Sequence, residues 1–268
     1  MTETAQKAGD LLSRIREIRP VVHSITNFVV MNSTANVLLA LGAAPIMAHA
    51  LEEIEDISAI SNSLVINIGT LSSAWIESME SAAQLARASM KPFVLDPVGS
   101  GATKLRTKTA CNIARFSTPT VIRGNASEIL SIARVGSKTR GVDSVNSTEE
   151  AMESASTLAT SLNTVVAVTG SKDFVTDGKR SLVIAGGSPM MACVTGTGCA
   201  ASVIVAAFLA VEKDALLATA SALALFKLVA EKASIKSAGP GSFWVGVLDE
   251  LYNVTSEEFR LNARILSI

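Results

Sequence analysis

The chain repeats one pattern, in which a short apolar run ends in polar residues and a helix-forming segment follows. Residues 64–70 are followed by a helical pattern over 72–89, and residues 93–96 are followed by one over 103–116. A third apolar run, over 119–122, again precedes a helical pattern. Such runs predict strands buried on both faces, and strands that alternate with helices pair in parallel through right-handed crossovers. The chain is therefore expected to be an α/β protein with a central, mostly parallel sheet and helices on both faces.

The segments outside these units extend the prediction. Apolar side chains recur at helical spacing over 11–18, and Pro20 ends this first predicted helix. An Asp-Gly pair at 177–178 lies between two β-like segments, 174–176 and 181–185. This arrangement predicts a hairpin with a tight turn, which makes the sheet mixed.

Two apolar stretches, 200–211 and 215–233, are separated by the charged residues 212–214. Each piece is too short and too interrupted to span a bilayer, so we expect two buried helices and no membrane partner. Residues 135–147 are polar and rich in glycine and serine. They predict an exposed loop.

Composition excludes several classes of protein. Of the 268 residues, 49% are hydrophobic, which is ample for a large core. The 23 basic and 24 acidic residues nearly cancel, which argues against nucleic acid as a partner. Three cysteines without CxxC spacing favour neither a disulfide framework nor a zinc site. With no apolar secretory segment at the N-terminus, a cytoplasmic location is expected.

Residues 194–199 (Val-Thr-Gly-Thr-Gly-Cys) precede the first apolar helix. Two glycines let consecutive backbone N–H groups turn toward an anion at the start of a helix, so phosphate is the expected guest. Cys199 falls in the first helical turn, where the helix dipole is expected to lower the pKa of its thiol and prepare it as a base. The alternative is a glycine-rich turn before a buried helix, with Cys199 as a small core residue.

Ligands of parallel sheets bind beyond the carboxyl ends of the strands, which gathers several polar residues at one edge. These include Asn67, Asp96, Arg123 and Thr169. An arginine can neutralise phosphate oxygens and a carboxylate can hold Mg²⁺ or its waters, so the set is typical of phosphoryl transfer. Neither a Walker A sequence nor an opening GxGxxG is present.

Each of these positions also has a purely structural interpretation. Asn125 and Glu128 have the spacing of a helix cap, and Asp96 before Pro97 could shape a turn. His23, within a β-like run over 21–27, is expected to be a hydrogen-bonded histidine without a catalytic part.

Five motifs stand in order along residues 21–221. They are Val-His-Ser-Ile-Thr-Asn at 22–27, Gly-Ala-Ala-Pro-Ile-Met at 42–47, Asp-Pro-Val-Gly at 96–99, Arg-Gly-Asn-Ala-Ser-Glu at 123–128 and the turn at 194–199. Together they resemble the hydroxyethylthiazole kinase family of the ribokinase-like superfamily. The resemblance implies one ribokinase-like kinase domain over residues 1–268. It also implies ATP-dependent phosphorylation of the hydroxyl of 4-methyl-5-(2-hydroxyethyl)thiazole with Mg²⁺, in thiamine salvage.

The same resemblance implies a role for each motif residue. Cys199 would be the catalytic base, at a position where the superfamily usually has aspartate. Family members are similar in forming homotrimers with the thiazole site between subunits. The remaining roles are substrate binding by Asn27, Met47 and Gly196, ATP binding by Arg123 and Thr169, and Mg²⁺ binding by Asp96 and Glu128.

Two other functions stay open at this point. One is a kinase for a different small alcohol such as a hydroxymethylpyrimidine, which the motifs at 23–27 and Met47 disfavour. The other is a catalytically idle relative that senses thiazole or nucleotide.

Overall fold

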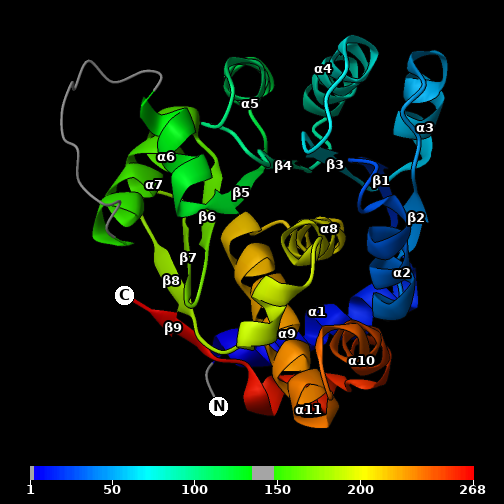
Figure 1. Ribbon diagram of the computed structural model, residues 1–268, viewed down its shortest axis with the longest axis vertical. Helices are drawn as coiled ribbons and strands as arrows, with labels where there is room; N and C mark the ends of the chain where they lie inside the picture. Colours follow the sequence, from blue (N-terminus) through cyan, green and yellow to red (C-terminus); the bar gives the residue numbers. More distant parts are fainter. Residues whose placement is uncertain (1–2, 135–147) are drawn as a thin grey trace.

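The computed structural model describes residues 3–134 and 148–268, so the predicted loop over 135–147 lies outside the described residues. Nine strands of the described chain form one sheet, shown in Figure 1. They are β1 (Val21–Ile25), β2 (Ala44–Ile46), β3 (Ser63–Asn67), β4 (Phe93–Asp96), β5 (Val121–Asn125), β6 (Val165–Thr169), β7 (Asp173–Thr176), β8 (Ser181–Ile184) and β9 (Ile265–Ser267).

The strands are ordered β2-β1-β3-β4-β5-β6-β7-β8-β9 across the sheet. From β2 to β6 every neighbouring pair is parallel, whereas β7, β8 and β9 extend the sheet in antiparallel fashion. All carboxyl ends of β1 to β6 therefore lie at one edge. This confirms the predicted mixed, mostly parallel sheet.

Side chains of the central strands alternate between two cores, as the pleat of a strand requires. Val65, Val94 and Val121 belong to one apolar cluster. Their neighbours Ile66 and Leu95 belong to the other. Both faces of the sheet are therefore covered, which explains why the sequence of these strands is apolar throughout rather than alternating.

Helices pack on each face (Figure 1). The first core includes residues of α1 (Glu3–Ile18), α2 (Met31–Leu41), α8 (Thr197–Leu209), α9 (Ala215–Lys236), α10 (Pro240–Asn253) and α11 (Ser256–Asn262). The second core includes residues of α3 (Ile54–Ile60), α4 (Ser73–Ala88), α5 (Lys104–Ser117), α6 (Ala126–Arg134) and α7 (Thr148–Leu162).

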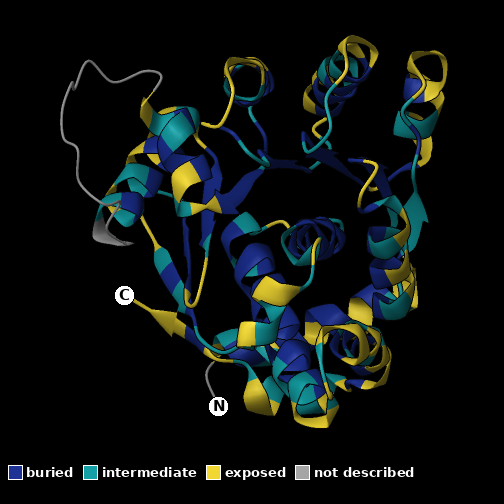
Figure 2. Ribbon diagram, in the orientation of Figure 1, coloured by how far each residue is buried: buried dark blue, intermediate teal, exposed yellow. Residues whose placement is uncertain are grey.

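The helices α8 and α9 are the two apolar helices that the sequence predicts. Residues 199–209 of α8 are all buried, and α8 and α9 are mostly dark blue in Figure 2. The helix α8 packs against β4, β3 and β1. Its start lies at the carboxyl ends of β3 and β4, because Cys199 contacts Asn67 and Ser202 contacts Asp96. The fold thereby brings residues 194–199 to the polar strand ends. No helix within the described residues is long and apolar enough to cross a membrane.

The predicted hairpin is confirmed, because β7 and β8 pair in antiparallel fashion and residues 177–180 connect them. Asp177 accepts hydrogen bonds from the backbone of Lys179 and Arg180 in this turn. A 3-10 turn, η1 (Leu51–Glu53), directly precedes α3. Strand β9 was not predicted, because three residues are too few for a period to show.

Candidate active site

A hydrogen-bonded polar cluster lies at the carboxyl ends of β3 and β4, with Asn67 at its centre. Asn67 and Asp96 are register partners at the ends of these two strands. The Asn67 amide nitrogen donates to Asp96 Oδ2 at 2.9 Å and to Cys199 Sγ at 3.1 Å. Its oxygen accepts from Asn27 Nδ2 at 2.8 Å. Four polar side chains from β3, β4, α8 and the segment after β1 therefore form one buried network.

Asp96 is fully buried, and its carboxylate is shared among several donors. Ser202 of α8 donates to Oδ2 at 2.9 Å, and Arg123 of β5 approaches both oxygens at 3.4 Å. Burial raises the pKa of Asp96 from 3.8 to about 6, against the lowering effect of the Arg123 charge. The alternative that Asp96 only shapes a turn before Pro97 is therefore wrong, since its side chain is hydrogen-bonded within the buried network.

Arg123 joins two parts of the site, because it contacts Asp96 on one side and donates to Thr169 Oγ1 at 2.6 Å on the other. Its guanidinium also lies against the first turn of α8, where a Cβ on Gly198 would come within 2.9 Å of Nη2. Glycine is thus required at 198 for this approach. Arg123 Nε has no hydrogen-bond partner among the described residues. A cation at the positive end of a helix favours an anion between them.

The prediction of a lowered thiol pKa at Cys199 is wrong. Cys199 is buried, and its pKa is raised from 9.0 to about 11. Desolvation by burial is the largest cause, and the carboxylate of Asp96 raises the value further. Arg123 and the amides of Asn67 and Asn27 lower it by less. The start of the helix therefore does not give a thiolate here, because the thiol lies in a desolvated position beside a carboxylate.

The predicted helix cap at Asn125 and Glu128 is confirmed. Asn125 Oδ1 accepts from the Glu128 backbone at 2.9 Å, and Glu128 Oε2 accepts from the Asn125 backbone at 2.8 Å. Glu128 Oε1 accepts from Gly99 in the loop after β4 at 2.8 Å. The carboxylate thus links α6 to the Asp96 loop. The described residues contain no group of three or more His, Cys, Asp or Glu side chains that could hold a metal.

The other predicted residues lie at the same edge but outside the network. Gly196 is the N-cap of α8, and a Cβ there would meet Val30 Cγ1 at 2.8 Å. Met47 follows β2 and is half-buried. The ring of His23 is buried and its Nε2 bonds to the Ala48 carbonyl at 2.9 Å, and burial lowers its pKa. This confirms the structural interpretation of His23, which fixes the segment that carries Met47.

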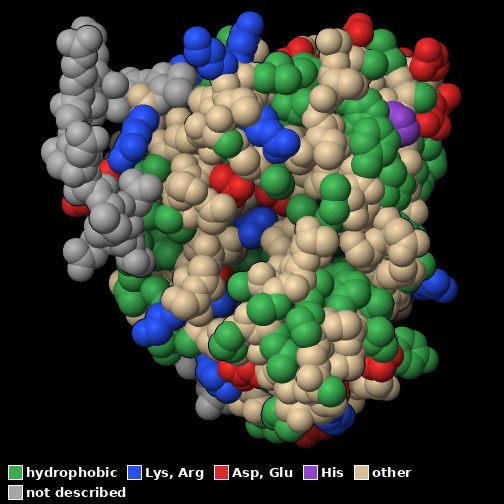
Figure 3. Space-filling view, viewed as in Figure 1, with side chains coloured by type: hydrophobic (Ala, Val, Ile, Leu, Met, Phe, Trp, Pro, Cys, Tyr) green, Lys and Arg blue, Asp and Glu red, His purple; other side chains and the backbone are tan. Residues whose placement is uncertain are grey.

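A cleft of about 830 Å³ opens beside Arg123, between the ends of β5 and β6 and the first turn of α8. Thr169, Gly198 and the glycines of the loop after β8 line it, together with apolar side chains of α8 and α9. Figure 3 shows this face hollowed near its middle, with basic and acidic side chains at the hollow. The cleft is large enough for a ligand of nucleotide size.

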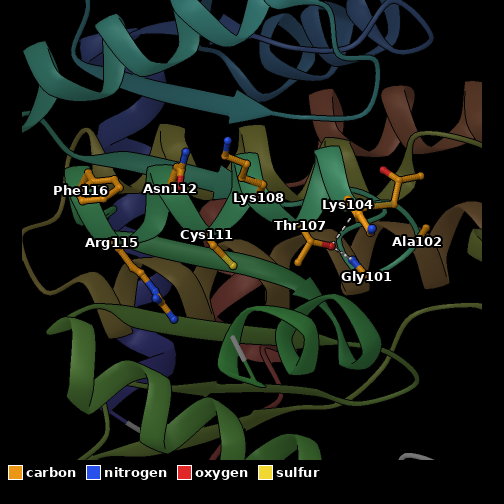
Figure 4. A pocket seen from close by; sticks show the side chains of 10 residues that line it. Gly101, Ala102, Lys104, Thr107, Lys108, Cys111, Asn112, Arg115 and Phe116 are labelled. Atoms are coloured by element: carbon orange, nitrogen blue, oxygen red, sulfur yellow. Dashed lines mark hydrogen bonds between the residues drawn. The ribbon is translucent and has the colours of Figure 1, made fainter. Parts of the chain in front are cut away.

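A second cavity of about 570 Å³ lies along α5 and the loop before it (Figure 4). Its lining includes Lys104, Lys108 and Cys111, with Phe116 at one end. None of the predicted site residues contributes to it. The candidate active site is therefore the cleft and the polar network, not this surface cavity.

Three residues that matter to the site's geometry had no predicted role. The sequence places Asn67 at the sheet edge, since it lies at the end of a buried strand. Its place at the centre of the network shows only when β4 is paired beside it and brings Asp96 into contact. Ser202 lies inside an apolar helical run and gives no signal. Lys227 does give one, since it is the single charged residue of α9 between Ala215 and Ala230.

A ribokinase-like superfamily protein from Enterococcus faecalis V583 has a similar structure. It aligns with a TM-score of 0.67 over 92% of this chain and 95% of that chain, at 13% identity. A likeness at this identity concerns the fold alone. The chain is therefore a protein of the ribokinase-like fold, with an anion-compatible site at the carboxyl edge of its sheet.

Closer similarities identify the family. The model of the hydroxyethylthiazole kinase family matches residues 12–257. A hydroxyethylthiazole kinase from Desulfotalea psychrophila is 51% identical over 265 residues, covering 99% of this chain and 97% of the relative. The structure of the hydroxyethylthiazole kinase protein from Pyrococcus horikoshii OT3 aligns with a TM-score of 0.91 at 44% identity, covering 98% and 99% of the two chains. The chain belongs to the hydroxyethylthiazole kinase family.

The raised pKa of Asp96 predicts a specific pH dependence of stability. Between pH 6 and pH 4 the folded protein binds a proton at Asp96 that the unfolded chain does not, so the contribution of Asp96 to the free energy of unfolding rises as pH falls. The substitution Asp96→Asn removes the titrating group and with it this pH-dependent contribution to stability. Relative to that variant, the wild type should gain about 2–3 kcal/mol between pH 7 and pH 4. Urea unfolding at both pH values measures it.

Asp56→Asn, on the exposed surface of α3, controls for the loss of a carboxyl group. A difference between wild type and Asp96→Asn that stays constant with pH would contradict the raised pKa.

Proposed function

We propose that this chain transfers the γ-phosphoryl group of ATP to the hydroxyl of 4-methyl-5-(2-hydroxyethyl)thiazole, a step of thiamine salvage. The observation that carries the proposal is the position of Arg123, whose guanidinium meets the first turn of α8 beside an open cleft. Phosphate groups are the anions that such a pair of positive features binds. The relatives named above as hydroxyethylthiazole kinases support the same acceptor.

The nucleotide occupies the cleft in this proposal, and Arg123 and Thr169 bind it. Both residues line the cleft and contact each other. The bond from Arg123 to Thr169 holds the guanidinium at the cleft side of the polar network. A guanidinium fixed in this way can neutralise the charge that develops on the transferring phosphoryl group.

The thiazole alcohol binds on the other side of Cys199, toward β1 and β2. Asn27 supports this placement because its Nδ2 lies 3.7 Å from Cys199 Sγ, and Gly196 because it packs on Val30 at the start of α2. Met47 follows β2 at this side of the sheet edge and supplies apolar surface for the ring. The acceptor and the nucleotide would then meet at the first turn of α8.

Asp96 and Glu128 are suited to organising Mg²⁺ through its waters. Burial raises the pKa of Asp96, and the nearby charge of Glu128 raises it further, so the two carboxylates are close enough to act on each other. Mg²⁺ keeps several waters and is usually held by one or two carboxylates together with substrate phosphates, which this donor set fits. When bound, it would neutralise phosphate charge during transfer.

Cys199 acts as a neutral thiol at the start of the reaction. With a pKa of about 11, roughly one thiol in 10⁴ is ionised at pH 7. Phosphoryl transfer passes through a loose transition state, in which the attacking hydroxyl keeps its proton until late. Oxygen attacks the γ-phosphorus and the bond to the β-phosphate oxygen breaks. The hydroxyl proton then reaches a phosphate oxygen, either directly or through Cys199, whose thiol donates its own proton as Sγ accepts the one from the hydroxyl.

The active assembly is proposed to be a homotrimer with the acceptor site between subunits. Phe28 and Val29, directly after Asn27, are 66% and 63% exposed, although both are apolar. The ring of Phe28 packs on Trp75 at a tilt of 42°, with ring centroids 4.7 Å apart, which holds this apolar surface in place. Apolar side chains of this size next to a binding site are typical of a protein interface.

The first experiment measures ADP release with Mg-ATP and either the thiazole alcohol, hydroxymethylpyrimidine or no acceptor. We expect release that depends on the thiazole alcohol, because Asn27 and Met47 shape that side of the site. Nucleotide binding is measured in parallel by calorimetry. Binding without release would indicate a sensor, and release with the pyrimidine alone would indicate a different kinase.

Substitutions at Cys199 separate proton transfer from thiolate chemistry. Cys199→Ala should lower kcat by about 10²-fold, the usual effect of removing a side chain that takes part in proton transfer. Cys199→Ser should retain kcat to within about tenfold, since a hydroxyl can hold and pass the same proton without ionising first. Steady-state kinetics of both variants at pH 7 and pH 9 tests this. An equal loss in the two variants, with a rate in the wild type that rises tenfold per pH unit, would require a thiolate.

Val29→Asp tests the proposed trimer. A carboxylate in an apolar interface would be desolvated without a partner, so the variant should dissociate. Light scattering after gel filtration should give three times the chain mass of 27.8 kDa for the wild type and the chain mass for the variant. Val245→Asp is the matched control, since Val245 of α10 is 59% exposed on another surface. A trimeric Val29→Asp variant would contradict this interface.

A further inference from the structure

A buried ion pair lies in the wall of the large cleft, on the side away from Asp96. Lys227 Nζ is 3.3 Å from Asp173 Oδ1, and both side chains are 5% exposed. Among the residues that the structure describes, these two and Arg123 are the charged ones that line the cleft. Neither has a role in the proposed phosphoryl transfer, although a charged pair is costly to bury unless its remaining hydrogen bonds are satisfied.

Lys227 satisfies those bonds with backbone carbonyls from two separate loops. Nζ donates to the carbonyl oxygens of Gly170 at 3.0 Å and Ser171 at 3.1 Å, in the loop between β6 and β7. It also reaches the Gly186 carbonyl at 3.4 Å, in the loop after β8. Asp173 Oδ1 in turn accepts from the Gly170 backbone at 2.9 Å. One ammonium therefore connects α9 to both loops that line the cleft.

The loop after β8 lies directly on the stem of Lys227. Gly187 has a φ of +91°, and a Cβ there would meet Lys227 Cγ at 3.4 Å and Met191 Sδ at 3.3 Å. The positive φ favours glycine at this position, and the short distances show that the loop packs against the side chain of Lys227. The course of this loop, and with it the width of the cleft, therefore depends on where the Lys227 side chain lies.

We propose that Lys227, neutralised by Asp173, is a positioning residue that sets the shape of the nucleotide cleft by holding its two loops. The proposal rests on the placement of ATP in this cleft. Lys227 does not bind phosphate itself, because an ammonium has three N–H donors and four protein oxygens lie within reach of them. Its loss should therefore weaken nucleotide binding while leaving the acceptor side and the chemical step unchanged.

The test compares three variants with the wild type. Lys227→Met keeps the bulk of the stem and removes the donors. Lys227→Met combined with Asp173→Asn also removes the unpaired carboxylate, so it controls for destabilisation by a buried charge. Lys232→Met is the matched control, because Lys232 is on the same helix but pairs with Glu250 at 2.8 Å away from the cleft. Each protein is titrated by calorimetry with the Mg²⁺ complex of a non-hydrolysable ATP analogue, and then assayed for ADP release.

In the single and the double variant we expect the Kd of the analogue and the KM for ATP to rise by at least about tenfold, the scale of losing hydrogen bonds to a charged group. The kcat at saturating ATP and the KM for the thiazole alcohol should stay within threefold. Lys232→Met should lower the melting temperature without changing the Kd.

Two results would overturn the proposal. A double variant with the wild-type Kd would mean that Lys227 only balances the charge of Asp173, and an equal rise in Lys232→Met would mean a general loss of stability. A wild type that does not bind the analogue would instead contradict the nucleotide site, and the proposed function would fail together with this role of Lys227.

Discussion

The buried carboxylate of Asp96 is the interaction on which the site depends. A carboxylate without water must be hydrogen-bonded or paired, and here the donors are Asn67, Ser202 and Arg123. Each donor comes from a different element, so satisfying one charge fixes the relative positions of β3, β5 and α8 at the end of β4. Hydrogen bonds are directional whereas apolar burial is not, so this network restricts the relative positions of these elements more closely than the cores alone would. The same network positions Cys199, because Asn67 donates a hydrogen bond to Cys199 Sγ.

A buried ion pair lies at each of the two walls of the cleft, and each pair connects two elements of the fold. Arg123 and Asp96 connect strand ends on one side, and Lys227 and Asp173 connect α9 to a strand on the other. In each pair the cation also bonds to a neighbour in the wall, Thr169 for Arg123 and loop carbonyls for Lys227. Breaking a buried pair costs far more than breaking a surface pair. The cleft therefore has fixed walls before any ligand enters, which lowers the ordering cost of binding.

The sequence predicts the layers of this fold well, because strands covered on both faces must be apolar and the apolar runs are plain to see. It also predicts that Asp96, Arg123 and Thr169 meet, because parallel strands have a common carboxyl edge. Prediction from the sequence fails where a property such as a pKa depends on two opposing effects at one atom. The start of a helix lowers a thiol pKa, yet burial and Asp96 raise that of Cys199 by more. Partners such as Ser202, inside an apolar helix, give no pattern at all.

A neutral Cys199 changes which interactions can lower the barrier of the proposed reaction. If the thiol is protonated at neutral pH, the acceptor cannot be activated by a strong base held next to it, and the barrier must fall by other means. Phosphoryl transfer allows this, since its loose transition state gains more from placing charge around the phosphoryl group than from an ionised nucleophile. In the proposed arrangement, the transferring phosphoryl group is surrounded by the groups that can stabilise its charge. These are Arg123, the first turn of α8, and Mg²⁺ held through Asp96 and Glu128. The desolvation that keeps the Cys199 thiol protonated also strengthens each of those electrostatic contacts, so one buried environment accounts for both.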